Sequence, residues 1–540
     1  MLNTVIVGGG LSGLALASLL GTKSVDYRLF EARERLGGRV LTLREPARLV
    51  KDARGLTREL PGLALDCGPT WFWPSDNPQM ARLLGALGIA TFGQHETGRL
   101  VFAPAAGVPP QRAPSQLAYA SAQRIVGGVG AVIDALASRV GAERIRLGHE
   151  LLAVAQLEDC VELSFACQGV VVKVRAGRVV LALPPRLVHE RIEFSPTLPA
   201  ELRAALARAP TWMASHAKAL SPFPRPFWRE NGDSGAAFAP YRGAVLGEVF
   251  DASDATNQPA LGGFFALSPD QRRAQRDELG KLVHRQLAEL FGPLPEGTPE
   301  PHIQDWATER FTTSTLDLEQ PASEPTGAPP LVREPLWNER LFIGGTETGL
   351  HHPGHLEGAL EAAMRIAALL LQDRPAQPGQ AEAQRPQDPA LCAWLEHFSR
   401  SLPARKAEAA TVYRDSVQRA LSSEESQGVT QRALLEAAAS VYRGVLSELA
   451  SAEFPRRKLE PSEIGEHANA VLASLAELNQ ELVRDAMKTN QTSCALRAFP
   501  EEARPDDEYL QIIRSDLQTL LQEFKRRVER LLGALPSSAA

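Results

Sequence analysis

The chain has 540 residues, of which 44% are apolar and 23% charged, with a formal net charge of −6. This is an ordinary balance for a globular protein, and the length suggests roughly three or four domains. No basic run supports nucleic-acid binding, and no apolar stretch approaches the roughly 18 residues of a membrane-spanning helix. The five cysteines form no CxxC pair, so neither a disulfide framework nor a zinc site is expected.

The first predicted elements are a strand, a glycine-rich turn and a helix. Residues 4–7 (TVIV) predict the strand, and no signal or transit segment precedes it, which favours a cytoplasmic protein. Residues 8–13 (GGGLSG) match G-x-G-x-x-G, and the apolar pattern of residues 14–20 predicts the helix. A second strand at residues 27–30 ends at Glu31, 18 residues after the last glycine. This context predicts a dinucleotide-binding unit.

Each part of this unit has an expected role in binding the dinucleotide. Gly8 allows the tight turn, Gly10 lets the backbone approach a pyrophosphate, and Gly13 lets the helix pack on the strand. The phosphates are expected at the positive N-terminus of the helix, where Ser12 would also contact the dinucleotide. Glu31 would accept hydrogen bonds from the ribose hydroxyls.

The residues after Glu31 indicate which dinucleotide is bound. Arg33 must be considered, because an arginine at a 2′-phosphate position would suggest NADP. Residues 35–39 (RLGGR), however, resemble the second fingerprint of FAD enzymes of the flavin-containing amine oxidase family. That resemblance spans about residues 1–372 and implies FAD. It places Gly38 close to the pyrophosphate and Arg39 as the cation that neutralises it, with Arg33 as a further cofactor contact.

Three more segments resemble that family between the fingerprint and residue 190. Residues 65–72 (LDCGPTWF) are similar to the segment that passes the flavin ring, where Trp71 would form a wall. Residues 124–130 (RIVGGVG) resemble the return into the FAD domain, and the backbone of Leu151 in the next strand would then meet the adenine. Residues 179–185 are similar to the apolar, proline-ended strand that closes this half of the domain.

The likeness resumes at residues 340–348 (RLFIGGTET), another strand and glycine turn, and continues into a helix at residues 360–371. By resemblance, Gly345 and Glu347 would hold the ribityl or pyrophosphate region. The N–H of Leu356 would point at the flavin N1–C2=O edge, which becomes anionic on reduction. A helix N-terminus stabilises such a charge.

Lys218 is the candidate catalytic residue. It precedes Trp228 by ten residues, and this spacing matches the lysine and F-W pair of the family. In those enzymes the lysine holds a water against flavin N5 and aids the reaction of reduced flavin with oxygen. A cation at that place also stabilises developing negative charge.

The substrate pocket departs from the family pattern. Many members face two aromatic residues toward the substrate, but alignment on Trp306 puts Leu316 and His355 at these positions. We expect Trp306, Leu316 and His355 to line the pocket. Covalent members carry a cysteine where this chain has Thr315, so non-covalent FAD is expected. His355 could bind a substrate carboxylate, help proton transfer or only line the pocket. No metal is expected, because no carboxylate spacing supports iron or zinc.

The predicted fold is an α/β FAD-binding Rossmann-like domain interleaved with an α+β substrate domain, followed by an all-α helical bundle. The final helix shows apolar residues at nearly heptad spacing between residues 510 and 531. These stripes predict the bundle's own core, with homo-oligomerisation or partner binding as the alternative. The expected boundaries are 1–75, 120–190 and 335–372 for the FAD-binding domain, 76–119 and 191–334 for the substrate domain, 373–390 for a linker and 391–540 for the bundle.

The leading functional prediction is an FAD-dependent oxidoreductase that converts the C–N bond of a small or medium amine to an imine, with oxygen as acceptor and hydrogen peroxide as product. An L-amino acid oxidase and a C–C desaturase of the same fold stay open. The alternative of another class is an FAD-stabilised scaffold whose C-terminal helices recruit a partner.

Overall fold

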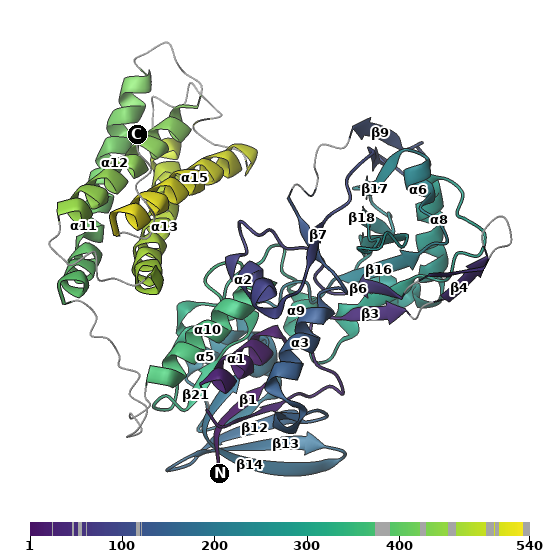
Figure 1. Cartoon of the computed structure of the whole chain (residues 1–540), viewed down its shortest axis with the longest axis horizontal. Helices are drawn as coiled ribbons and strands as arrows, with labels where there is room; N and C mark the ends of the chain where they lie inside the picture. Colours follow the sequence, from purple (N-terminus) through teal and green to yellow (C-terminus); the bar gives the residue numbers. More distant parts are fainter. Residues whose placement is uncertain are drawn as a thin grey trace. The chain divides into compact units, whose positions relative to one another are not determined.

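The computed structural model describes residues 1–23, 25–45, 48–51, 57–60, 62–114, 119, 121–372, 389–421, 428–451, 461–492, 502 and 507–532. The chain forms two compact units, Met1–Pro375 and Ala376–Ala540. Figure 1 shows both, and each is described by itself. No helix in the described part of the chain is long and apolar enough to cross a bilayer.

An eight-stranded sheet forms the base of the first unit, with the order β11-β2-β1-β14-β13-β12-β15 and β21 paired to β14. Strands β1, β2, β11, β14 and β21 pair in parallel, whereas β13 runs antiparallel to β12 and β14. The bounds are β1 (Leu2–Val7), β2 (Tyr27–Phe30), β11 (Ile145–Arg146), β12 (Glu150–Gln156), β13 (Val161–Cys167), β14 (Val170–Leu181), β15 (Glu193–Ser195) and β21 (Leu341–Ile343).

The register brings four strand ends to one edge of this sheet. Val7 pairs with Phe30 and with Leu181, and Leu181 pairs with Ile343. Ligands of open parallel sheets bind beyond such carboxyl ends. Because β21 comes from the end of this unit and β1 from its beginning, a site at this edge draws on both.

Apolar helices cover both faces of the sheet. On one face α1, α2, α3 and α10 share a core with Ile6, Leu29 and Val180, and Figure 1 shows α1 between α3 and α10. Most residues of α1 are buried, which explains its apolar character on all sides. Helix α5 packs on the other face, against Val5, Val154 and Val179. The bounds are α1 (Leu11–Thr22), α2 (Pro78–Leu87), α3 (Gly130–Val140), α4 (Pro185–Arg191), α5 (Ala200–Ala207) and α10 (Leu356–Gln372).

Glu357 ties the first turn of α10 to the start of α2. Its Oε1 accepts a hydrogen bond from Gln79 N (2.8 Å) and its Oε2 one from Met80 N (2.9 Å). These N–H groups have no partner within α2, and a carboxylate also suits the positive end of the helix. The burial of Glu357 raises the pKa of its carboxyl, against the effect of the two N–H donors.

Replacing Glu357 with alanine is expected to lower the free energy of unfolding by about 1–2 kcal/mol, because two buried donors lose their acceptor. Glu357→Gln keeps one acceptor oxygen and should cost less. Urea unfolding followed by circular dichroism measures both variants. Equal losses in the two variants would contradict a capping role.

A seven-stranded sheet dominates the rest of the first unit, in the order β20-β16-β19-β18-β17-β8-β9. Helices α6 and α8 pack on it around Phe223, Trp228 and Phe291. The bounds are β8 (Arg99–Phe102), β9 (Gln111–Pro114), β16 (Ala217–Pro222), α6 (Phe227–Glu230), β17 (Asp233–Phe238), β18 (Leu246–Asp251), β19 (Ala260–Phe265), α7 (Pro269–Ala274), α8 (Leu279–Phe291), β20 (His302–Asp305) and α9 (Thr315–Glu319). Three short pairs complete the unit, namely β3 (Thr42–Glu45) with β6 (Leu63–Asp66), β4 (Arg48–Lys51) with β5 (Thr57–Leu60), and β7 (Thr91–Gly93) with β10 (Gln123–Ile125).

The described part of the second unit consists of α11 (Pro389–Leu421), α12 (Val429–Ser451), α13 (Pro461–Thr492) and α15 (Asp507–Leu532). The apolar stripes predicted for this region are buried in one shared core, which includes Leu434, Leu475 and Leu517. The predicted helical bundle is therefore present. The predicted linker, residues 373–390, lies outside the described residues except for its last two positions.

Candidate active site

A cavity of about 430 Å³ lies directly beyond the carboxyl edge of the parallel strands. Its lining begins where the strands end, with Gly8 after β1, Glu31 after β2, Ala182 after β14 and Gly345 just after β21. Its volume is in the usual range for a small-molecule or cofactor site. The other lining residues come from segments 37–40, 67–77, 212–218 and 306–312, from Phe264, and from the start of α10.

The first glycine turn has no room for a side chain at Gly8 or at Gly13. Gly8 has φ +108°, and a Cβ there would lie 2.5 Å from the carbonyl oxygen of Ala182. A Cβ on Gly13 would lie 1.9 Å from the carbonyl oxygen of Gly8, so the helix can pack this closely only with glycine. Ser12 Oγ donates to the carbonyl oxygen of Gly344 at 2.5 Å and joins the first turn of α1 to the turn after β21.

The second glycine turn lies against the first. Gly10 and Gly37 form an isolated β-bridge, and a Cβ on Gly38 would lie 3.4 Å from the Cα of Gly10. Both Gly10 and Gly38 line the cavity, together with Arg39. The structure thus brings the two predicted pyrophosphate-binding turns to one wall.

Glu31 lies in the cavity wall at the predicted ribose position. Its Oε2 accepts a hydrogen bond from Gly9 N (2.6 Å) and its Oε1 one from Arg33 N (2.9 Å). The Arg33 side chain reaches the other side of the cavity, where Nη2 donates to Glu309 Oε2 (3.1 Å) and Thr312 Oγ1 (2.9 Å).

Glu347 is a fully buried carboxylate (0% exposed) beside the cavity wall. Arg39 Nη1 lies 2.7 Å from its Oε1. Despite this ion pair, neither carboxylate oxygen accepts a hydrogen bond among the described residues. Buried carboxylates need such donors, and the hydroxyls of a ribityl chain or ribose can supply them. The pair therefore fits a dinucleotide with hydroxyl groups on this side.

Lys218 lies on β16 and is 2% exposed. Its Nζ donates to the carbonyl oxygens of Asp66 (3.0 Å) and Gly68 (2.7 Å) and to Thr70 Oγ1 (2.5 Å). Burial lowers the pKa of Lys218 to about 8, against the opposing attraction of Asp66 and other nearby groups. A lysine so placed can carry or release a proton near neutral pH, which is unusual for a structural side chain.

Aromatic rings surround the lysine. Its Nζ lies 5.0 Å from the ring centre of Phe264 and 5.9 Å from that of Trp71. Trp71 stacks on Tyr119 with 4.9 Å between centroids. Trp306 donates Nε1 to the carbonyl oxygen of Cys67 at 3.1 Å and also lines the cavity.

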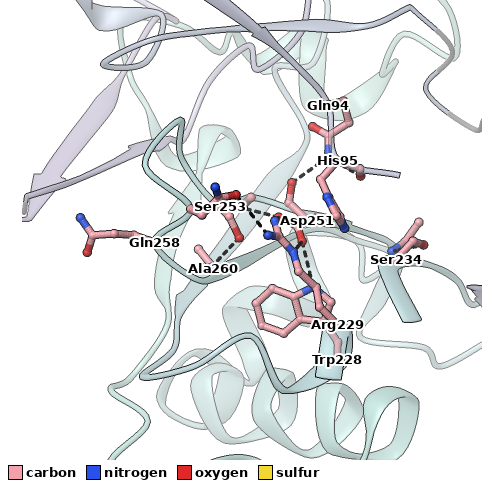
Figure 2. A network of polar contacts seen from close by, with 12 residues as sticks. Gln94, His95, Trp228, Arg229, Ser234, Asp251, Ser253, Gln258 and Ala260 are labelled. Atoms are coloured by element: carbon pink, nitrogen blue, oxygen red, sulfur yellow. Dashed lines mark hydrogen bonds and ion pairs between the residues drawn. The ribbon is translucent and has the colours of Figure 1, made fainter. Parts of the chain in front are cut away.

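A polar network around Asp251 supports the indole of Trp71, and Figure 2 shows Gln94, Trp228 and Arg229 around that aspartate. Gln94 accepts a hydrogen bond from Trp71 Nε1 (2.8 Å) and donates to the carbonyl oxygen of Asp251 (2.8 Å). The Asp251 carboxylate accepts hydrogen bonds from Trp228 Nε1 (2.8 Å) and from Arg229 Nε (2.7 Å) and Nη2 (2.9 Å). Gln94 therefore connects the cavity wall to the core of the second sheet.

Gln94→Leu is expected to lower the free energy of unfolding by about 1 kcal/mol, since Trp71 Nε1 and the Asp251 carbonyl both lose a partner. Trp71→Phe removes the same indole N–H. In a double-mutant cycle read by urea unfolding, Gln94→Leu should cost less in the Trp71→Phe background than in the wild type. If the two losses in the free energy of unfolding are strictly additive, the hydrogen bond between Gln94 and Trp71 does not stabilise the fold.

The open end of the cavity carries histidine and tryptophan side chains. His355 is exposed there, with its Nδ1 3.0 Å from the carbonyl oxygen of Pro353. The centroid of its ring lies 6.1 Å from that of Trp212, which in turn lies 5.9 Å from that of His216. Surrounding protein atoms lower the pKa of His355, and His352 and Arg39 add repulsion.

Two family models match this chain, "Flavin containing amine oxidoreductase" over residues 108–371 and "NAD(P)-binding Rossmann-like domain" over residues 6–87. Flavin-containing amine oxidase A of Canis lupus familiaris is 24% identical over 461 residues, covering 69% of this chain and 85% of the relative. Amine oxidase B of Homo sapiens is 24% identical over 461 residues, covering 68% and 86%. The chain belongs to the flavin-containing amine oxidase family.

Solved structures show the same fold. Cyclohexylamine oxidase from Brevibacterium oxydans IH-35A matches with a TM-score of 0.54 and 20% identity, over 68% of this chain and 98% of that one. Putrescine oxidase bound to putrescine matches with a TM-score of 0.52 and 20% identity, over 69% and 99%. The predicted fold class is confirmed. The exact division of residues 1–372 into two interleaved domains stays a prediction.

Membership of the flavin-containing amine oxidase family makes the chain an FAD-dependent oxidoreductase, as predicted.

The cavity brings most of the predicted site residues together. Those that line it are Gly8, Gly10, Ser12, Glu31, Arg33, Gly38, Arg39, Trp71, Lys218, Trp306, Gly345, His355 and Leu356. Gly13 and Glu347 lie directly behind this lining, against Gly8 and Arg39.

Two further predicted site residues lie outside the cavity lining, and the first of them is Leu316. It lies on α9, and this segment contributes Phe311 and Thr312 to the lining instead. Helix α9 is anchored by the buried Asp317, which accepts hydrogen bonds from Arg186 and Ser314. The place of Leu316 in the substrate pocket stays a prediction.

Leu151 also lies outside the lining, in the core beneath the sheet and next to an irregularity of β12. Its contact with adenine stays a prediction.

Sequence reasoning missed several cavity residues, including Trp212, His216, Phe311 and Thr312. The alternation of His216 with Lys218, two residues apart, was the one signal that could have found His216.

Proposed function

We propose that this enzyme oxidises the C–N bond of a small or medium amine to an imine, with oxygen as the electron acceptor and hydrogen peroxide as product. The observation that carries the proposal is the buried ammonium of Lys218 in the same cavity as both glycine turns. When bound, FAD supplies the two-electron acceptor for this reaction. The chain itself orients the substrate, excludes water and places a cation beside developing negative charge.

The cavity favours an amine over an amino acid. A substrate carboxylate needs a free cation, and arginine is the usual partner. Among the described cavity residues the arginines are Arg33 and Arg39, which are held by Glu309 and Glu347 at the dinucleotide side. The remaining wall is rich in aromatic rings, including Trp73, Trp212 and Phe264, which suit an apolar amine.

We further propose that FAD is bound without a covalent link. Thr315 occupies the position of the family's linking cysteine and lies outside the lining. Cys67 is the cysteine that lines the described cavity, and burial raises the pKa of its thiol to about 11. A thiol that stays protonated is a poor nucleophile. Acid precipitation should therefore release all FAD into the supernatant, and flavin left in the pellet would contradict this.

The substrate class is tested with matched pairs, such as benzylamine against phenylglycine and phenethylamine against phenylalanine. The anaerobic rate of flavin bleaching is measured for each compound. Each amine is expected to reduce the enzyme at least about 10²-fold faster than its carboxylated partner, since burying an unpaired carboxylate is costly. Faster bleaching by the amino acids would make the protein an amino acid oxidase instead.

A further inference from the structure

His216 directly precedes β16 and stands two residues before Lys218. Side chains two residues apart in extended chain point to the same side. Both His216 and Lys218 line the cavity, as this alternation requires. The carbonyl oxygen of His216 accepts a hydrogen bond from Trp306 N (3.0 Å), which fixes the start of the strand beside another cavity residue.

The imidazole of His216 has no hydrogen-bond partner among the described residues. Its Nδ1 is buried and unpaired, whereas Nε2 is not fully buried. Histidines with structural roles normally have at least one ring nitrogen bonded, because an unpaired buried nitrogen costs free energy. A neutral ring with its proton on Nδ1 leaves Nε2 as an acceptor that can face a ligand in the cavity.

The charges around His216 favour the neutral ring. Burial lowers the pKa of His216, and the nearby Arg272 lowers it further. Arg272 comes from α7, donates to the carbonyl oxygen of Ser215 (2.8 Å) and pairs with Asp305 of β20. Lys218 also lines the cavity. The ring of Trp212 neighbours both His216 (5.9 Å between centroids) and His355 (6.1 Å). The lowered pKa favours the neutral ring, which has one nitrogen lone pair free to accept a proton.

The substrate of the proposed function needs such an acceptor. An alkylamine has a pKa of about 10 and is an ammonium ion in water at pH 7. Its nitrogen lone pair must be free for oxidation of the C–N bond. A second cation beside Lys218 in one buried cavity is also unfavourable.

We propose that His216 accepts the proton of the substrate ammonium as the amine enters the cavity. The inference rests on the proposed amine oxidation. One N–H bond of the ammonium breaks and one N–H bond forms on the imidazole, so a neutral amine and an imidazolium result and the total charge is unchanged. The imidazolium then passes this proton to solvent before the flavin is reduced, so no second cation stays beside Lys218 during the oxidation.

The test is anaerobic stopped-flow reduction of the FAD-loaded enzyme by an amine, at pH 6 to 10, for wild type, His216→Asn and His216→Gln. At pH 7 each variant should lose about 10²-fold in the second-order rate constant of bleaching. The loss should shrink towards pH 10, where the free amine is abundant and needs no base. The wild type should show an acid limb below pH 6.5 that does not move between amines of different pKa, and the variants should lack it.

His284→Asn is the matched control. His284 is a half-buried histidine of α8 whose Nε2 is likewise unpaired and whose pKa burial likewise lowers, but it does not line the cavity. Its rates should equal the wild type at every pH. The FAD absorbance spectrum and melting temperature show whether each variant is folded.

A loss in the His216 variants that is equal at pH 7 and pH 10, or no loss at pH 7, overturns the proposal while amine oxidation stands. If no amine bleaches the wild type, the proposed function fails and this role of His216 fails with it.

Discussion

Lys218→Met should slow the reoxidation of the reduced enzyme by oxygen about 10²-fold, because a preorganised buried cation stabilises the charge that develops in this step. The amine-driven, anaerobic reduction should slow by less than about tenfold, since that step does not need the same cation. Methionine keeps the length and apolar stem of lysine, so the wall formed with Trp71 and Phe264 stays filled. Stopped-flow mixing of the reduced enzyme with oxygenated buffer measures the first rate.

The pH dependence gives a second readout. The pKa of Lys218 is lowered to about 8, so the ammonium is charged below that pH and is lost as the pH rises through it. Wild-type reoxidation should fall over this range, and the Lys218→Met rate should stay flat. Lys281→Met, which changes an exposed lysine paired with Glu278, should behave as the wild type. Equal slowing of reduction and reoxidation by Lys218→Met would contradict the assigned role.

Arg39→Leu is expected to lower the free energy of unfolding of the FAD-free protein by about 3 kcal/mol, because it leaves the carboxylate of Glu347 buried and uncompensated. FAD retention should fall as well, since Arg39 lies in the wall beside both glycine turns. Urea unfolding measures the first effect and equilibrium dialysis of FAD the second.

The double variant Arg39→Leu/Glu347→Leu separates these two effects. It also removes the buried carboxylate of Glu347, which has lost its cation. It should therefore be more stable than Arg39→Leu alone while still binding FAD weakly. Arg44→Leu breaks an exposed pair with Asp134 (53% and 63% exposed) and should cost less than about 1 kcal/mol. A double variant less stable than Arg39→Leu would show that the pair is not the buried unit described here.

The parts of the site that follow local rules could be predicted from the sequence. Close backbone contacts require Gly8 and Gly13, and a φ of +58° favours glycine at Gly38. Because all three lie in short strand-turn segments, their spacing indicates their role. The stripes of the helical bundle are likewise local, because the helical period places Leu434 and Val445 on one face.

The parts set by tertiary contacts could not be predicted. The position of Leu316 outside the cavity lining could not be read from the sequence, because the direction of α9 depends on Arg186, far away in the sequence. Glu357 caps α2 across a still larger separation of 278 residues. His216 was missed because its side depends on where β16 begins.

We propose that one cavity holds FAD and oxidises an amine in front of Lys218. The most direct test is the absorption spectrum of the purified full chain during anaerobic addition of an amine, followed by admission of air. We expect a yellow protein with one released FAD per chain, bleached by at least one amine and recoloured by air with one hydrogen peroxide formed per amine. A colourless protein that binds no added FAD, or a yellow one that no amine bleaches, would contradict it.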